Sequence, residues 1–218
     1  KLCDRLENLL HNAIKAQVIA KYSEGLIPFK DTDDSEWYTE YISELKSKKF
    51  DGKPIFEGFK DTNGNPTGLF GPAENFRISE LLKIALTLGH HDIEDESLDD
   101  NAKLEKYKNH WAKKYLKKAL KLNLSLTKKK ENIDDYATRG EVFQTIVEAL
   151  NLTDTTCDTT TLSYTDLDPS HQYAKAACIL TQKGIISGTQ DGKILLDEKV
   201  NRAEIAKIIK KAIEAFKL

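Results

Sequence analysis

The sequence predicts an all-α protein built from three tandem units of similar length. Three short stretches end in nearly the same five-residue sequence motif, which we call the word. Its last residue is Glu80, Glu141 or Glu204, and these stand at almost equal intervals along the chain. Each Glu opens an apolar run with helical spacing, and self-similarity at a regular period indicates one structural unit used repeatedly. Extended stretches are few and short, near 54–59 and 193–196. We therefore expect three helical units that bury their apolar faces against one another.

The second helix of each unit follows directly from these words, and we place the three helices at about 76–89, 138–151 and 201–216. Apolar residues stand one, four and five positions after each Glu, with Thr145 as the polar exception, so one helical face faces a core. The words are Phe76-Arg77-Ile78-Ser79-Glu80, Ala137-Thr138-Arg139-Gly140-Glu141 and Val200-Asn201-Arg202-Ala203-Glu204. Thr138 with Glu141, and Asn201 with Glu204, form capping boxes. Arg77 is a poor cap, so Asn75 could start the first of these helices two positions earlier.

The first helix of each unit is led by an aromatic residue, Trp37, Trp111 or Tyr173. Each has apolar residues four and five positions on, which predicts helices at about 35–48, 105–123 and 170–183. The separation between the aromatic and the Glu is nearly the same in the second and third units and clearly longer in the first, so the first unit carries an insertion. The Gly-, Pro- and Asn-rich stretch 51–68 has the turn chemistry expected of that insertion.

These features together resemble the S-layer homology (SLH) domain family. The signature is an acidic turn, an aromatic-led helix, a Gly-rich loop and a Thr-Arg-Ala-Glu-like word. The third unit carries it best, in Tyr164-Thr165-Asp166-Leu167-Asp168, Lys183-Gly184-Ile185-Ile186-Ser187-Gly188 and Asn201-Arg202-Ala203-Glu204. The first unit has Phe29-Lys30-Asp31-Thr32-Asp33 and Trp37, but Ile78 stands where the motif has Arg. The second unit lacks the Gly-rich loop. The resemblance covers about residues 27–216.

The resemblance implies a pseudo-threefold, three-pronged α-helical array, with SLH repeats at 25–90, 91–153 and 154–218. An amphipathic N-terminal helix in 1–24 precedes them and is expected to pack on the array or to continue an upstream region. The implied function is non-covalent anchoring at the cell surface, through an anionic and often pyruvylated secondary cell-wall polysaccharide bound in grooves between repeats. Other surface-layer proteins are further expected partners. The implied glycan-binding residues are Arg139, Arg202, Asp31, Asp166, Trp37, Trp111, Tyr173 and Gly188.

The residues themselves leave alternatives open for these positions. Glu141 and Glu204 are explained by helix capping alone. An Arg in a first helical turn opposes the helix dipole, so something should compensate it, and a ligand carboxylate is one answer. The aromatic residues are expected mainly to fill a core, with a sugar-stacking face as the alternative. Because Ile78 cannot pair with an anion, the groove that uses it should contribute little. A rival function is a protein–protein scaffold that keeps the fold without binding sugar.

Composition and motifs narrow the remaining classes. Charged residues make up 31 % and hydrophobic residues 39 % of the chain, no apolar run is long enough to span a membrane, and no secretory signal is visible at 1–5. The chain contains no Met, so we expect a mature or excised piece whose signal is elsewhere. Cys3, Cys157 and Cys178 are odd in number and lack framework spacing, which argues against a disulfide scaffold and makes Cys178 a small core residue.

The charge pattern and the sequence motifs predict neither enzymatic activity nor a bound cofactor. Residues 103–130 hold 11 Lys against one acid, which predicts a solvated helix face. The alternatives are a face for an anionic polymer such as a wall glycan, or for a lipid surface, and nucleic acid is not an expected partner. An acidic block at 92–100 precedes this stretch as a linker that can form ion pairs with it. Asp61-Thr62-Asn63-Gly64-Asn65 fails the calcium-loop spacing, so it is interpreted as a turn. His residues are scattered and no catalytic motif is present, so we expect no metal and no enzymatic activity.

Overall fold

A computed structural model describes residues 2–23, 28–50, 52–94 and 102–218. The chain divides into two compact units, unit 1 at Lys1–Ala73 and unit 2 at Glu74–Leu218. The division falls inside the stretch predicted as the first repeat, and the predicted boundaries of the three repeats stay a prediction. The described part of the chain is mostly helical, with a single short hairpin as its only sheet. This confirms the all-α class. No helix in the described ranges is long and apolar enough to cross a membrane.

Unit 2 is organised around three helices, α3 (Ile78–Leu88), α7 (Arg139–Ala149) and α9 (Arg202–Phe216). They match the three predicted second helices closely at every end. The predicted apolar stripes are buried in all three helices, with no residue more than 5 % exposed. Even the polar exception, Thr145, is 1 % exposed, because its hydroxyl donates to the carbonyl of Glu141 one turn earlier at 2.7 Å. α3 and α7 contact each other, and burial of the three stripes supplies the core of the unit.

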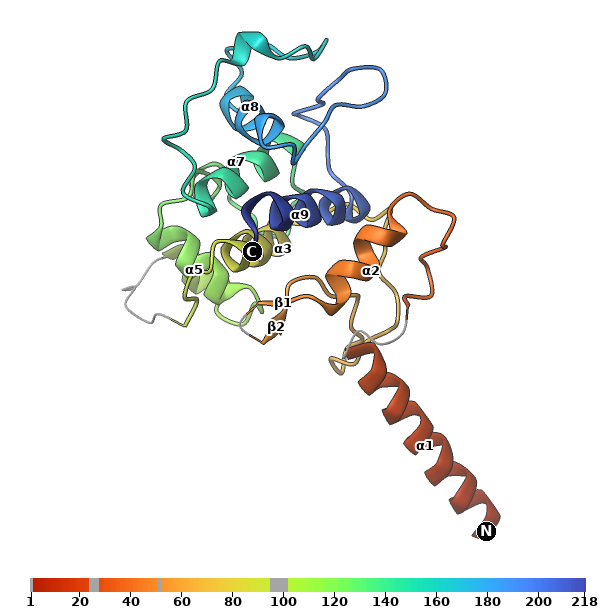
Figure 1. The fold of residues 1–218 in the computed structure, drawn as a ribbon. Helices are drawn as coiled ribbons and strands as arrows, with labels where there is room; N and C mark the ends of the chain where they lie inside the picture. Colours follow the sequence, from red (N-terminus) through yellow and green to blue (C-terminus); the bar gives the residue numbers. More distant parts are fainter. Residues whose placement is uncertain (1, 24–27, 51, 95–101) are drawn as a thin grey trace. The chain divides into compact units, whose positions relative to one another are not determined.

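The other helices of unit 2 pack on the outside of this core. Figure 1 shows α5 (Lys113–Lys121) beside α3 and α8 (Ala174–Gln182) beside α7. Each of these first helices therefore contacts the second helix of the preceding predicted repeat. The short α6 (Ser125–Lys129) and the 3₁₀ turn Thr159–Thr161 complete the unit. The prediction of one continuous helix at 105–123 is wrong. The structure has two helices there, because α4 (Ala102–Lys106) ends before a turn at 107–112 and α5 starts after it.

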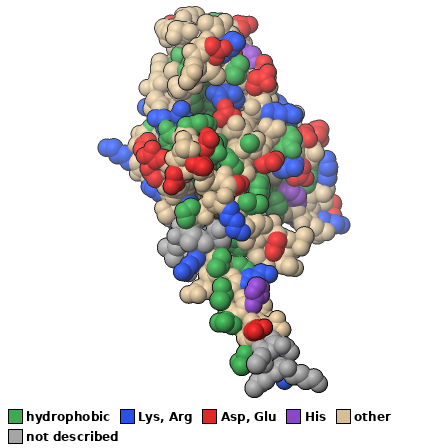
Figure 2. Space-filling model, turned by 90° about the vertical axis from the view of Figure 1, so that its right-hand side faces the viewer, with side chains coloured by type: hydrophobic (Ala, Val, Ile, Leu, Met, Phe, Trp, Pro, Cys, Tyr) green, Lys and Arg blue, Asp and Glu red, His purple; other side chains and the backbone are tan. Residues whose placement is uncertain are grey.

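Unit 1 contains α1 (Leu2–Ser23), α2 (Thr39–Ser47) and a hairpin of β1 (Lys49–Phe50) and β2 (Lys53–Pro54). The predicted N-terminal helix exists, and Figure 2 shows hydrophobic side chains exposed along it. Leu6, Leu9 and Leu10 are 58–66 % exposed, so the packing expected of this face is absent from these positions. Of the two extended stretches that we expected, the hairpin touches the first, and 193–196 contains no strand.

Two local predictions are corrected by the structure, and a third, the ion pairing of the acidic block with the Lys-rich stretch, is confirmed where the block is described. Cys178 is buried as expected, but it forms a disulfide with Cys157 across a Cα–Cα distance of 6.0 Å. Arg77, and not Asn75, is the N-cap of α3; its backbone N–H donates to the Glu80 carboxylate at 3.0 Å, which is half of a capping box. The acidic block is described only up to Glu94, which pairs with Lys114 at 3.1 Å, and the rest lies outside the described residues.

The aromatic register also differs from the prediction. Tyr173 is the N-cap residue of α8, whereas Tyr38 is the N-cap residue of α2 and Ala112 that of α5. Trp37 and Trp111 thus stand one position earlier than Tyr173 relative to their helices. The sequence pattern could not resolve this offset, because an aromatic with apolar partners four or five positions on fits both registers.

Candidate functional site

The three words of unit 2 are joined by a closed set of backbone hydrogen bonds. The N–H of Phe76 donates to the carbonyl of Val200 at 2.9 Å, that of Val200 to Ala137 at 3.2 Å, and that of Ala137 to Phe76 at 2.8 Å. A second set of backbone hydrogen bonds lies two residues further along each contact. The N–H groups of Arg202, Ile78 and Arg139 donate to the carbonyls of Glu74, Asp135 and Glu198, respectively, at 2.9–3.0 Å. Each word is therefore held by both of the others, and the starts of α3, α7 and α9 meet at one place.

The charged residues of the words continue this arrangement. Arg139 Nη1 donates to Glu204 Oε1 at 2.9 Å, and its Nε donates to the Ile194 carbonyl at 2.9 Å. Arg202 Nη1 pairs with Glu80 Oε1 in the same way. The Arg of one word thus holds the capping Glu of the next word. A Glu carboxylate thus supplies the negative charge that we expected beside each Arg, because the helix dipole disfavours a cation in the first turn.

The third position of this cycle is different, because Ile78 replaces the Arg. Ile78 is 1 % exposed, and the Glu that an Arg there would hold, Glu141, pairs instead with Lys130 Nζ at 2.9 Å. We call the two Arg–Glu pairs and this Lys–Glu pair the word ring. Arg139 and Arg202 are only 8 % and 3 % exposed, so their guanidinium groups lie inside the ring and not on an open surface.

The predicted acidic-turn residues support loop backbone. The Asp166 carboxylate accepts from the N–H groups of Ile194 at 2.7 Å and Leu195 at 2.9 Å. Burial acts to raise the pKa of Asp166, but these hydrogen bonds lower it below the ordinary value, so the group stays charged. In unit 1, Asp31 accepts from Phe70 and Gly71 in the same manner, at 2.8 and 2.7 Å. Both acids therefore fix the loop before a word.

Gly188 and Tyr173 are enclosed by their neighbours. A Cβ on Gly188 would lie 2.8 Å from the Lys193 carbonyl and 2.8 Å from the Tyr164 ring, so only Gly fits there. Tyr173 is 4 % exposed and confirms the core-filling interpretation. A Cβ on Gly140 would lie 2.2 Å from its ring, which explains why the second word has Gly where the third has Ala203. Burial, helped by nearby Glu141 and Asp197, raises the pKa of Tyr173 to about 12.

Trp37 and Trp111 contradict the core-filling interpretation, because each is 53 % exposed. In unit 1, Trp37 contacts Tyr38 and Tyr41 with ring centroids 5.5 and 6.4 Å apart. In unit 2, Trp111 contacts Tyr115 at 6.1 Å and lies over His110 at 5.6 Å. Both residues therefore present an aromatic surface to solvent, the geometry that suits stacking of a sugar ring.

Trp111 is one end of a continuous surface strip in unit 2. His110 Nε2 lies 3.2 Å from Asp134 Oδ1, and Arg77 Nη1 donates to the Asp134 carbonyl at 2.5 Å. The Arg77 guanidinium lies 5.0 Å from the Tyr136 ring centre, and Lys199 Nζ lies 5.2 Å from that ring. We call these residues the aromatic–cationic strip: Trp111, His110, Asp134, Arg77, Tyr136 and Lys199.

The strip combines aromatic faces, two exposed cations and one carboxylate, the side chains that recognise an acidic sugar. Sequence reasoning missed all of it except Trp111. One signal was present: in the first word the Arg stands one position earlier than in the other two, and the structure places this Arg77 outside the word ring. No cluster of His, Cys, Asp and Glu in the described ranges is arranged to hold a metal ion. Asp61 accepts from its own loop's N–H groups, as expected of a turn.

Comparison with known proteins gives one family. Residues 163–206 match the model of the S-layer homology domain, a stretch that contains Asp166, Tyr173, Gly188 and the third word. No curated protein matches the chain. S-layer homology domains are non-catalytic modules that generally anchor proteins to the cell wall through its polysaccharide. The chain thus contains a segment, 163–206, that is similar to an S-layer homology domain, a module that implies association with the cell surface or cell wall.

Proposed function

We propose that this chain anchors its parent protein to the cell wall by binding an anionic polysaccharide, with a pyruvylated sugar as the preferred acid. The observation that carries the proposal is the aromatic–cationic strip, joined to an S-layer homology match. Stacking on Trp111 would hold the sugar ring. Arg77 would meet the acidic group with a planar pair of donors, and Lys199 would add charge.

We further propose that the chain is composed of three SLH-type repeats, at 25–90, 91–153 and 154–218, around a pseudo-threefold axis. Three features support this proposal. The backbone hydrogen bonds that join the words occur three times, and the Arg–Glu pair occurs twice. Asp31 and Asp166 accept the same pair of backbone hydrogen bonds at the two places where the sequence predicts equivalent acidic turns.

The predicted glycan residues then divide into two roles. Trp37 and Trp111 are exposed and would contact sugar. Arg139 and Arg202 are enclosed in the word ring, and Asp31, Asp166, Tyr173 and Gly188 are bound to the backbone or packed in the interior. We propose that these six residues position the surface around the exposed groups. Binding at the strip would therefore depend on those of the six that lie in unit 2, through the shape of the site.

Sedimentation with purified cell walls tests the proposal. Trp111→Ala and Arg77→Ala should each lower affinity about ten- to a hundred-fold, the loss of a stacking platform or of a charged hydrogen bond. Lys183→Ala, an exposed Lys outside the strip, is the matched control and should bind normally. Walls stripped of their pyruvyl groups by mild acid should retain neither the native chain nor the control.

Unchanged binding of both strip variants would reject the strip as the glycan site. Failure of the native chain to bind any wall preparation would favour the rival function, a scaffold for other surface proteins. Helix content and melting temperature of every variant must match the native values, so that loss of binding is not loss of fold. Arg77 and Trp111 are both exposed, so their substitution leaves the core intact.

A further inference from the structure

Helix α1 concentrates exposed apolar side chains on one element of unit 1. Leu6, Leu9, Leu10, Ile14 and Val18 are all large apolar residues, and they are 41–66 % exposed. Figure 2 shows hydrophobic side chains at the surface along this helix. Scattered apolar side chains are normal on a protein surface, but a contiguous set on one element indicates an interaction surface.

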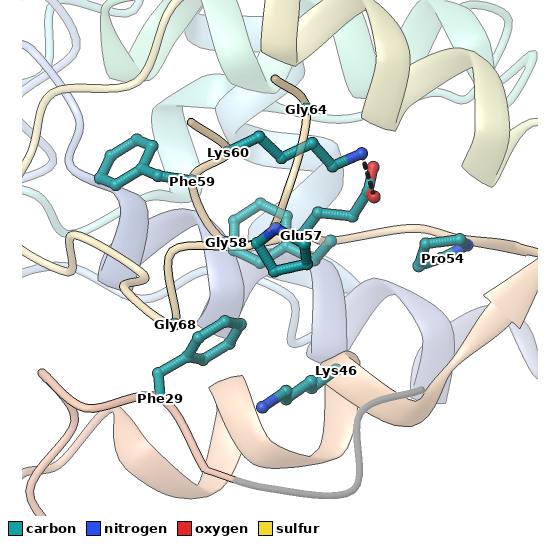
Figure 3. Close-up of a pocket in the computed structure, with 11 residues that line it drawn as sticks. Phe29, Lys46, Pro54, Glu57, Gly58, Phe59, Lys60, Gly64 and Gly68 are labelled. Carbon is teal, nitrogen blue, oxygen red and sulfur yellow. Dashed lines mark ion pairs between the residues drawn. The ribbon is translucent and has the colours of Figure 1, made fainter. Parts of the chain in front are cut away.

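The core of unit 1 is closed without this helix. Phe29, Phe56 and Phe70 are buried, and Phe70 contacts the other two with ring centroids 5.3 and 5.1 Å apart. Lys46 Nζ covers the Phe29 ring from the other side, 4.1 Å from its centre (Figure 3). No described residue of α1 lines the cleft that Figure 3 draws around these side chains. The core of unit 1 therefore does not account for the apolar residues of α1.

One side of α1 faces its own unit. A groove of about 320 Å³ lies between the helix and the loop that contains Asp61. The helix residues that line this groove are His11, Ile14, Lys15, Val18 and Ile19. Because an α-helix has 3.6 residues per turn, Leu6 and Leu9 point away from that loop. The other side of the helix is therefore open to a partner.

This open side of α1 follows a heptad repeat. Its apolar residues stand at alternating steps of four and three: Leu2, Leu6, Leu9, Ala13, Ala16 and Ala20. The steps are the a/d spacing of a coiled coil, and the 22 residues of α1 span about three heptads. From Leu6 to Ala20 the members of this set are exposed, and none of them lines the groove. We call the six positions the α1 seam.

The α1 seam is complementary in size to a second copy of itself. Its first half holds leucines and its second half alanines. In an antiparallel pair that sets Leu6 opposite Ala16 of the second copy, Leu9 lies opposite Ala13. Each layer then joins a large residue to a small one, so the helices keep one spacing along the pair. A parallel pair in register would set Leu against Leu at one end and Ala against Ala at the other.

The charges of α1 also favour a second copy. The positions that flank the seam are Cys3, Arg5, Leu10, Asn12, Gln17 and Ile19. Arg5 is the only charged residue among them, and in the antiparallel pair it lies near Ile19 of the second copy, so like charges do not meet. The polar side of α1 carries both signs, in Asp4, Glu7, Lys15 and Lys21. A helix that lies on a lipid surface is instead rich in Lys and Arg on that side.

We propose that two copies of this chain associate through the α1 seam as an antiparallel pair of helices. The interface is isologous, because both copies contribute the same face. One helical seam offers fewer residues than the 20–30 per side of a standard interface, so we expect a Kd of about 1–100 μM. The pairing lies in unit 1 and does not involve the aromatic–cationic strip of unit 2.

Sedimentation velocity of the chain between about 1 and 500 μM tests the proposal, a range that brackets the expected Kd. The Cys3→Ser chain serves as the background, so that a disulfide-linked dimer is excluded. We expect a reversible monomer–dimer equilibrium. Leu9→Asp places a charge in the middle of the seam and should raise the Kd at least tenfold. Asn8→Asp adds the same charge one residue away on the polar side of α1, and its Kd should stay within twofold of native. Both positions are exposed, so both variants should fold.

Oxidative cross-linking tests the orientation. Leu9→Cys and Ala13→Cys chains, each in the Cys3→Ser background, should cross-link when they are mixed and much less when each is alone. Three results overturn the proposal: a monomer at every concentration, equal self-association of Leu9→Asp and native chains, or cross-linking of Leu9→Cys mainly with itself.

A lipid surface is the competing partner for this face. Binding of a monomeric chain to vesicles of phosphatidylcholine and phosphatidylglycerol, lost in Leu9→Asp, would also overturn the proposal. Wall sedimentation separates this inference from the anchoring function. A Leu9→Asp chain keeps its own strip and should still bind walls, so loss of self-association and loss of anchoring are distinguishable.

Discussion

Arg202→Met tests whether the word ring holds unit 2 together. The Arg202 side chain is 4 % exposed and its partner Glu80 is 24 % exposed, so the substitution leaves a carboxylate mostly enclosed. Removing one partner of a fully buried pair costs about 3–5 kcal/mol. Glu80 keeps the N–H of Arg77 as a partner at 3.0 Å and some access to water, which lowers our expectation to about 2–3 kcal/mol. For a unit of this size that free energy corresponds to a fall in melting temperature of roughly 4–12 °C.

The assay is guanidinium-induced unfolding of the native chain and the three variants of a double-mutant cycle. Arg202→Met, Glu80→Gln and the double variant yield the coupling free energy of the pair, which we expect at about 1–3 kcal/mol. Lys130→Ala is the comparison at the third position of the ring. The Lys side chain is 26 % exposed but its partner Glu141 is only 7 % exposed and keeps the Thr138 N–H as a partner, so by the same reasoning this substitution should also cost about 1–3 kcal/mol. A coupling below about 0.5 kcal/mol would refute the reasoning, because the ring would then be a consequence of the fold and not a cause of its stability.

Three other predictions concern the core around the ring. Gly140→Ala should destabilise unit 2 by about 1–3 kcal/mol in thermal unfolding, because the new Cβ would lie 2.2 Å from the Tyr173 ring; a neutral result would show that the ring moves freely. The pKa of Tyr173 is raised to about 12 from 10.0, so folded chains keep a proton that unfolded chains lose between these values. Stability should therefore fall as pH rises from 10 to 12, and Tyr173→Phe should lose less over this interval than the native chain. Ile208→Asp in α9 buries an unpaired charge and should reduce hydrogen-exchange protection in α3 and α7 too; loss confined to α9 would indicate independent helices.

The second helices could be predicted from the sequence because their signals are local. Thr138 and Asn201 cap α7 and α9 with Glu141 and Glu204, as the capping-box pattern predicts. The pattern failed for α3 in a physically simple way. The backbone contact from Ile78 to the Asp135 carbonyl fixes the start of the helix from outside, so no side-chain cap is needed. At the start of α3 a hydrogen bond to a residue distant in sequence thus takes the place of a side-chain N-cap.

The remaining differences come from contacts between distant residues. The disulfide joins Cys157 in a loop to Cys178 in α8, and only the fold brings them together. The Arg–Glu pairs cross 65 residues in one case and 122 in the other, so the sequence showed that Arg139 and Arg202 need a partner but not which one. Trp37 and Trp111 are equally exposed, and both stand one position further from their helix than Tyr173, an offset that apolar spacing alone did not reveal.

The asymmetry of the first word connects these observations. In the second and third words the Arg occupies the first helical position, where the ring encloses it against a Glu. In the first word that position is Ile78, buried at 1 % exposure, and the Arg stands one residue earlier on the surface. The ring then needs a cation for Glu141, and Lys130 supplies it from the end of the Lys-rich stretch. One exchange therefore has two consequences: an enclosed structural Arg is replaced by an exposed one beside Tyr136, and a surface Lys is recruited into the ring. In the first word the charged group therefore lies on the surface beside Tyr136, whereas in the other two words it lies inside the word ring.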